Sequence, residues 1–265
     1  MSRPIGPGRL AYLHIRLGVQ QELQYRANFW VQVVNSAIAL GVGIVAIAVV
    51  YLHTDSLAGW SPDELVTVLG VHLMVGGFLR AFVFPNMYKL MSDVEEGTLD
   101  YTLTRPADSQ LLVSVREVEL WSLIDVVSGA GVLVWAVSRL GDQVGVIHYL
   151  AFLVALICGS VILYCLWIVA ATLAFKVVRV DNVMQMLSGI YDAGRWPVGV
   201  YPFWLRGGLT YLVPLAFAIT VPAETISGRI DWPWLLVAVG FTVVAFVVAR
   251  LVWLWGIRNY SGASA

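Results

Sequence analysis

Long apolar runs recur along this sequence, and they constrain the fold more than any other feature. A helix of about 20 apolar residues crosses a hydrocarbon layer about 30 Å thick. Six runs are expected to act as spans: 29–52, 64–84, 118–138, 148–175, a shorter one at 183–200, and 232–256. Alternation of about ten residues, typical of membrane barrels, does not recur. The sequence therefore predicts an all-α membrane protein with six transmembrane helices.

The charged fraction of 12% supports this class, because soluble proteins carry about 25%. We expect residues 29–256 to form the transmembrane domain and residues 257–265 a cytoplasmic tail. In residues 1–28, the apolar side chains Tyr12, Ile15, Val19 and Leu23 follow helical spacing. That spacing favours a cytoplasmic interfacial helix, although a disordered tail is the alternative.

The positions of the cations predict the orientation, since positively charged loops resist translocation. With both termini in the cytoplasm, the larger group of cations faces the cytoplasm: Arg3, Arg9, Arg16, Arg26, Lys89, Arg105, Arg116, Lys176, Arg179 and Arg258. The smaller group faces outward: Arg139, Arg195, Arg206 and Arg229.

Residues 194–231 are apolar but are interrupted by glycine and proline. One continuous helix does not run through such a segment. We expect two short helices, 203–212 and 214–224, that enter the outer leaflet and return before the last span. Irregular backbone at membrane depth needs cover from protein or a watery cavity, so this region is expected to line or cap something.

Motifs for nucleotide binding and catalysis are missing from the sequence. A phosphate-binding loop needs lysine followed by serine or threonine, whereas Lys89 precedes Leu90 and Lys176 precedes Val177. No nucleophile and base appear at a recognisable spacing, and no zinc-ligand spacing is present. The net charge of -1 gives no reason to expect a nucleic-acid partner. We therefore expect no cofactor or metal in this chain and no enzymatic activity from it alone.

Ionisable residues inside the predicted spans need partners, because a charge in lipid costs about 2.5 to 3.5 kcal/mol. Arg80 and Asp125 are expected to lie on neighbouring spans, where they either form an ion pair or Arg80 extends to the interface. For Asp192 and Arg195 we expect a local salt bridge. His72 is interpreted as a packed or pore-facing side chain rather than a catalytic base.

The polar connection 85–116 contains the stretch EEGTLDYTLTRP at 95–106. Such a loop can be a simple linker, but its order favours a compact unit. A helix is expected to begin after Pro85 and to end near Gly97, and Arg105-Pro106 prevents helix from continuing to the third span. The result is a charged knob that suits docking on a soluble partner.

Two stretches carry a family resemblance. The run MSDVEEGTLDYTLTRPADSQLL resembles the first cytoplasmic loop of ABC-2 type permeases, and GRWPVGVYPFWLRGGLTYLVPLAFAITVPAETISG resembles a pattern of one bacterial branch of them. Together with the spans, the resemblance covers nearly the whole chain. It implies a type V exporter-like fold and the permease subunit of an ATP-driven exporter in a bacterial inner membrane.

The resemblance also implies partners and site residues. Two separate ATPase subunits would carry ATP and Mg, and a second permease, identical or homologous, would complete the transporter. The coupling residues would be Glu95, Glu96, Gly97, Thr98 and Leu99, and the re-entrant gate would contain Tyr201, Pro202, Pro214 and Pro222. The family often has a basic residue before Gly-Thr, where this chain has Glu96, which puts the docking contacts in doubt.

Two other functions compete with this one. An ion-coupled secondary transporter would suit the interrupted helix, but the two halves show no inverted repeat and few acids lie at mid-membrane. An intramembrane enzyme would need a catalytic constellation that the sequence does not show.

Overall fold

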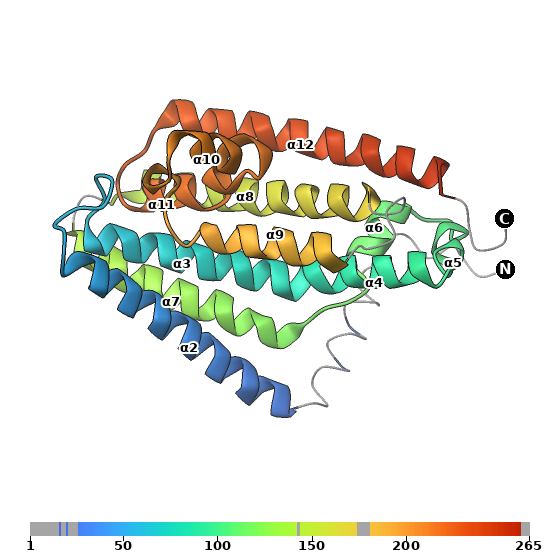
Figure 1. Ribbon diagram of the computed structural model, residues 1–265, viewed down its shortest axis with the longest axis horizontal. Coiled ribbons are helices and arrows are strands. Elements are labelled where there is room, and N and C mark those ends of the chain that lie inside the picture. The colour runs from blue at the N-terminus through green and yellow to red at the C-terminus, as the bar shows by residue number, and fades with distance from the viewer. Residues whose placement is uncertain (1–15, 17–19, 21–25, 142–143, 174–180, 261–265) are drawn as a thin grey trace.

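The computed structural model describes residues 16, 20, 26–141, 144–173 and 181–260, and every regular element within them is a helix (Figure 1). The surface helix expected in residues 1–28 lies almost entirely outside the described residues. The long helices are α2 (Arg26–Tyr51), α3 (Pro62–Phe78), α7 (Leu123–Leu140), α8 (Val146–Leu173) and α12 (Trp232–Arg258).

Shorter helices connect these long ones. Between α3 and α7 lie the π-helix η1 (Leu79–Val83), α4 (Phe84–Glu95), α5 (Asp100–Leu103), α6 (Ser109–Ser114) and the 3-10 turn η2 (Leu120–Ser122). Between α8 and α12 lie α9 (Asp181–Ala193), the 3-10 turn η5 (Val198–Val200), α10 (Phe203–Gly207), η6 (Gly208–Leu212), η7 (Ala216–Thr220) and α11 (Val221–Ile226).

Within the described residues, five helices are long and apolar enough to cross a membrane. They are Ala27–Tyr51, Pro62–Glu95, Leu120–Leu140, Val146–Leu173 and Trp232–Arg258. A sixth candidate is formed by two helical stretches, Phe203–Leu212 and Ala216–Ile226, whose axes differ by 77°. These two stretches are here called the bent pair. The fifth span expected at 183–200 is a shorter helix, since α9 has 13 residues and therefore a length of about 20 Å.

Helical structure continues past Pro85, although the second span was expected to end there. Proline has no backbone N–H to donate to the preceding turn. In that turn the carbonyl of Ala81 accepts from the N–H of Glu119, at an N–O distance of 2.9 Å. The π-helix η1 just before Pro85 further accommodates the ring, and the result is one helical stretch from Pro62 to Glu95.

The stretch Pro62–Glu95, which begins with α3, occupies the centre of the bundle. Of its 18 most apolar consecutive residues 78% are buried, whereas the same measure gives 17% for α2 and for α12. Glycines bring α3 and α7 close together: a Cβ added at Gly129 would lie 2.6 Å from the carbonyl oxygen of Gly70. A second close approach lets α8 meet the bent pair, where a Cβ on Gly159 would lie 2.5 Å from the Cα of Ala218.

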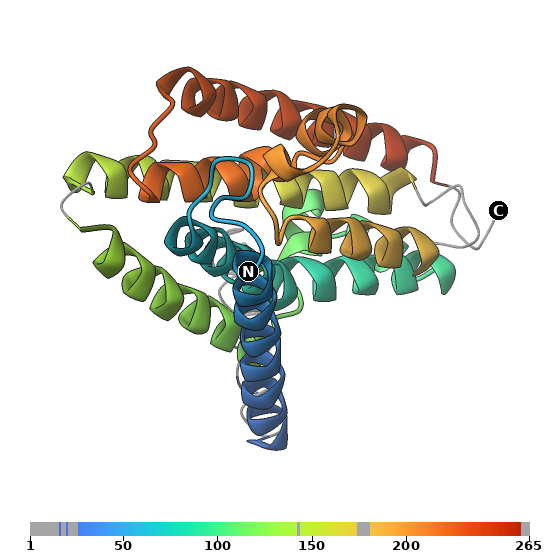
Figure 2. The ribbon, with the colours of Figure 1, turned by 60° about the vertical axis from the view of Figure 1, so that its left-hand side comes forward.

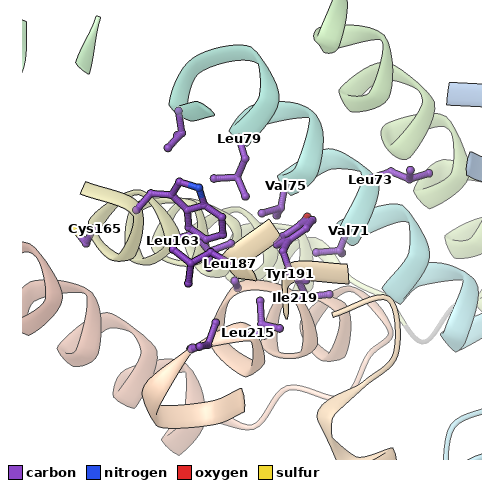
Figure 3. Close-up of a cluster of buried hydrophobic side chains, with 14 of the residues drawn as sticks. Val71, Leu73, Val75, Leu79, Leu163, Cys165, Leu187, Tyr191, Leu215 and Ile219 are labelled. Carbon is purple, nitrogen blue, oxygen red and sulfur yellow. The ribbon is translucent and has the colours of Figure 1, made fainter. Parts of the chain in front are cut away.

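The core forms where α3, α8, α9 and the bent pair meet (Figure 3). Val71 and Val75 of α3 and Leu79 of η1 lie in one cluster with side chains of the other elements: Leu163 of α8, Leu187 and Tyr191 of α9, and Ile219 of η7. Cys158 and Cys165 are free and buried on α8. Each Å² of apolar area buried in this core stabilises the fold by about 25 cal/mol.

The short helices divide between the two ends of the bundle (Figure 1). α4, α5 and α6 gather at one end, here called the knob end, whereas α10 and α11 lie toward the opposite end. α2 extends away from most of the bundle along its N-terminal half (Figure 2), where it keeps contact with α7 through Gln32 and Ser36. Large apolar side chains such as Trp30, Val34 and Ile38 are therefore exposed on α2.

Candidate functional site

The residues from Phe84 to Ser114, here called the knob, form a compact unit in which Gly97 ends α4. Gly97 has φ +68°, a conformation that suits glycine because it has no Cβ. The N–H of Thr98 donates to the carbonyl of Asp93 at 2.8 Å, and the N–H of Gly97 donates to that of Val94 at 3.3 Å. These two bonds form a Schellman motif, so the helix end expected at Gly97 is confirmed.

Asp93 lies at the centre of the knob and is only 4% exposed. Its carboxylate accepts from the guanidinium of Arg116, from the ammonium of Lys89 at 3.1 Å and from the hydroxyl of Thr98 at 3.3 Å. A buried carboxylate needs such charge-assisted partners to offset its desolvation. Asp93 thereby links α4, the turn after Gly97 and the segment that leads to α7.

Asn86 fastens the first turn of α4 to that returning segment. Its amide nitrogen donates to the carbonyls of Phe82 and Glu117, both at 2.7 Å. Its side-chain oxygen accepts from the N–H groups of Arg116 at 2.8 Å and Glu117 at 3.0 Å. The residue is 1% exposed, so this amide satisfies four backbone groups that water does not reach.

Polar contacts also tie α6 to α8 and α12. The hydroxyl of Tyr164 on α8 lies 2.8 Å from that of Ser114 and 3.4 Å from the amide nitrogen of Gln110. The Arg250 guanidinium on α12 binds the carboxylate of Asp108 and the side-chain oxygen of Gln110. Burial acts to raise the pKa of Asp108, but the hydrogen bond and charge of Arg250 together with the backbone N–H groups of Leu111 and Gln110 outweigh it and hold that pKa below its usual value.

The five expected coupling residues differ in exposure. Glu95 and Glu96 are exposed, Gly97 and Thr98 are partly buried, and Leu99 is fully buried at 0%. Leu99 therefore belongs to the core of the knob and offers no surface for docking in this conformation. Further exposed residues follow Leu99 and extend this surface, among them Tyr101, Thr104 and Arg105.

The structure brings Arg80 and Asp125 together. Nη2 of Arg80 lies 2.7 Å and Nε 3.1 Å from Oδ2 of Asp125, and the same oxygen accepts from the amide of Gln32 at 2.9 Å. The Asp125 side chain is 4% exposed and that of Arg80 is 39% exposed. One carboxylate thus joins α2, η1 and α7 near the knob end of the bundle.

His72 is packed against Tyr191 rather than facing an open path. The two rings stack with centroids 4.7 Å apart, and the Tyr191 hydroxyl donates to the backbone carbonyl of His72 at 2.6 Å. Next to this pair, the expected salt bridge between Asp192 and Arg195 spans 4.0 Å, at the limit of an ion pair.

The expected gate residues shape the bent pair. The Tyr201 hydroxyl donates to the carbonyl of Ala193 at 2.7 Å and so caps the end of α9. The carbonyl of Pro202 accepts the first N–H groups of α10. Pro214 lies at the bend between Leu212 and Ala216, and Pro222 lies in the first turn of α11. The helix bounds agree with the sequence-based ones to within two residues.

Sequence reasoning missed the roles of Asn86, Asp93, Arg116 and Asp108. One signal in the sequence could have indicated ion pairs here: this polar segment contains acidic and basic residues together with short apolar stretches. The pairing itself depends on chain reversal between α4 and α6, which residue spacing does not reveal.

These features define a polytopic helical membrane protein with a compact polar unit at one end of its bundle. Residues 37–264 match the family described as ABC-2 family transporter protein. The chain therefore belongs to the ABC-2 transporter family, and it is a multi-pass permease subunit of ABC transporters. A search of curated proteins and a search of solved structures found no match.

Proposed function

We propose that this chain is the passive membrane half of an ATP-driven exporter in a bacterial inner membrane, moved by two separate ATPase subunits that dock on the knob. ATP and Mg would be bound by those subunits. A second permease, identical or homologous, would complete the translocation path. No observation favours the ion-coupled alternative.

The construction of the knob carries this proposal. An exposed acidic surface at Glu95 and Glu96 stands on a buried cluster centred on Asp93. Asn86 fixes the knob to the segment entering α7, while Arg250 and Tyr164 fix it to α12 and α8. A force applied to the exposed surface would therefore reach several membrane helices through polar contacts rather than dissipate in a flexible loop.

The proposed orientation puts the knob and both termini in the cytoplasm. Lys89, Arg105 and Arg116 belong to the knob end. By contrast, Arg139 lies in the last turn of α7, Arg206 lies in α10 of the bent pair, and Arg229 follows α11. This distribution follows the tendency of cationic loops to remain inside. On this orientation, the bent pair with Tyr201, Pro202, Pro214 and Pro222 would re-enter from outside and close the path.

In the proposed cycle, ATP binding brings the ATPases together and displaces the knobs. The displaced knobs shift the spans between two arrangements. A bound ligand contributes to this shift only by binding the two arrangements unequally. Export is the direction that the family resemblance favours.

Charge reversal on the knob tests the proposal. The variant Glu95→Lys with Glu96→Lys should lose partner-stimulated ATP hydrolysis by about tenfold or more, since one lost charged contact is worth about 1.5 to 3 kcal/mol. Membrane insertion should not change, because both side chains are exposed. The measurement is ATPase activity of the reconstituted complex together with co-purification of the ATPase.

Asp55→Lys serves as the matched control, because Asp55 is exposed in the loop between α2 and α3. This control should retain the ATPase and its stimulation. Full stimulation in the Glu95 and Glu96 variant would remove the reason for assigning coupling to the knob.

A further inference from the structure

A cavity of about 990 Å³ opens toward the end opposite the knob. It lies between the bent pair, the loop before α3 and the first turn of α12. Its walls include Trp60, Phe203, Arg206, Tyr211, Glu224 and Trp234. The volume is at the upper end of the range of small-molecule sites, about 300 to 1,000 Å³.

Aromatic residues indicate the depth of this cavity in the membrane. Phe203 is 91% exposed and Tyr211 62%, and both line it. Trp204 on α10 and Trp232 at the start of α12 are also exposed, although neither lines the cavity. Tryptophan and tyrosine concentrate at the level of the lipid headgroups. The cavity therefore lies where headgroups lie, with apolar walls that continue to the exterior.

Part of the charge in the cavity is already neutralised by the protein. The guanidinium of Arg229 contacts the carboxylate of Glu64 at 2.7 and 2.9 Å, donates to the carbonyl of Gly59 and stacks over Trp60. Asp231 caps α12 by accepting from the N–H of Trp234 at 3.2 Å. These contacts leave Arg229 with little capacity for a ligand.

Arg206 and Glu224, unlike Arg229 and Asp231, have few polar contacts within the protein. Arg206 donates to the carbonyl of Gly199 at 2.7 Å, and it has no carboxylate partner among the described residues. The Glu224 carboxylate has neither a hydrogen bond nor an ion pair within the described part of the chain, although its residue is half-buried in the wall. The cavity thus presents one guanidinium and one carboxyl group, neither of which has an ion-pair partner among the described residues, between apolar walls.

We propose that this cavity binds a membrane phospholipid whose headgroup carries a phosphate and a primary ammonium. Arg206 binds the phosphate, Glu224 accepts from the ammonium, and the acyl chains leave the cavity past Phe203 and Tyr211. Charge complementarity selects a zwitterionic headgroup over a purely anionic one, because Glu224 repels anions. The ammonium must donate hydrogen bonds, so a quaternary choline fits less well. Binding at this site needs no ATP and does not depend on the proposed coupling.

Native mass spectrometry of the purified chain tests this site. Lipids with identical acyl chains and ethanolamine, choline or glycerol headgroups are titrated in mild detergent. We expect the ethanolamine lipid to bind about tenfold more tightly than the other two, since a charge-assisted hydrogen bond is worth about 1.5 to 3 kcal/mol. Equal binding of the three lipids would overturn the proposal without any substitution.

Variants then assign the headgroup contacts. Glu224→Gln should remove the preference for ethanolamine, and Arg206→Gln should weaken the binding of all three lipids, because each carries the phosphate. Arg195→Gln is the control, because Arg195 lies near Asp192 and does not line the cavity. If Arg195→Gln lowered binding as much as Arg206→Gln, the phosphate site would not be at Arg206.

Soluble glycerophosphoethanolamine separates a lipid from a free headgroup. A lipid site predicts that this competitor binds at least about a hundredfold more weakly than the full lipid, because burying each CH₂ group contributes about 0.8 kcal/mol. Competition at equal concentration would assign the cavity to a soluble zwitterion and overturn the lipid assignment.

Discussion

Arg250 on the last span holds Asp108 at the start of α6, and the same guanidinium reaches Gln110 at 3.0 Å. Arg250 lies within the predicted span 232–256, yet its side chain contacts the knob. This contact completes the connections between the knob and the long helices. The chain enters the knob after α3 and leaves it toward α7, and polar contacts join the knob to α8 and α12.

Replacing Arg250 with glutamine should separate transport from ATP hydrolysis. The pair is exposed, 37% at Arg250 and 41% at Asp108, so the loss in the free energy of unfolding should be within about 1 kcal/mol. Transport per ATP should fall several-fold, because α12 no longer follows the knob. The measurement compares the two rates in proteoliposomes containing the complete transporter.

Arg250→Lys is the informative companion variant, since lysine keeps the charge but lacks the planar fork. It should recover part of the lost transport. If Arg250→Gln left transport per ATP unchanged, the contact would be a surface pair without a role in coupling.

Replacing Asn86 with alanine should destabilise the junction between α4 and the segment entering α7. The N–H groups of Arg116 and Glu117 would lose their acceptor, and a buried donor without a partner costs about 1 to 3 kcal/mol. We expect a clearly lower thermal midpoint in detergent. Asn259→Ala is the control, since exposed Asn259 makes one side-chain bond at 2.7 Å to the carbonyl of Trp255.

Replacing Asp125 with asparagine should loosen α2 from the bundle. The charge that binds Arg80 is lost while the shape is kept, and the exposure of Arg80 limits the effect to about 1 to 3 kcal/mol. Ser128→Ala removes the neighbouring link to Ser36 and should cost less. Proteolysis rates or thermal midpoints measure both variants. An Asp125→Asn protein as stable as the parent would rule out a structural ion pair.

Replacing Gly159 with alanine should push the bent pair away from α8. The new Cβ would lie 2.5 Å from the Cα of Ala218, a backbone atom that does not move aside alone. Overpacking of this kind costs about 1 to 3 kcal/mol. Gly240→Ala on α12 is the matched control, because nothing lies within 4 Å of its added Cβ. Equal thermal midpoints for the two variants would contradict the close approach.

Hydrophobicity and glycine-proline punctuation were enough to predict the membrane class, most span bounds and the bent pair near 203–226. The fifth span was wrong in length because apolar composition does not distinguish α9 from the turn at Val198–Val200 that follows it. Helix through Pro85 was also missed, since its stability depends on Glu119, 34 positions away.

For the candidate sites, charge in lipid predicted a need for partners, and for Arg80 it indicated Asp125. It did not indicate Asp108 for Arg250, because that pair joins residues 142 positions apart. The burial of Leu99 was also hidden from sequence, since a motif does not reveal which of its residues face inward. The cavity that contains Arg206 and Glu224 forms because the two stretches of the bent pair fold against each other, which residue spacing does not reveal.

The missing amide at Pro85 has a consequence for the junction between membrane and knob. At this junction the carbonyl of Ala81 accepts from the N–H of Glu119, and proline adds no N–H of its own to the turn. Proline, usually regarded as a helix breaker, here lies in a continuous helical stretch that a distant residue, Glu119, joins by a backbone hydrogen bond.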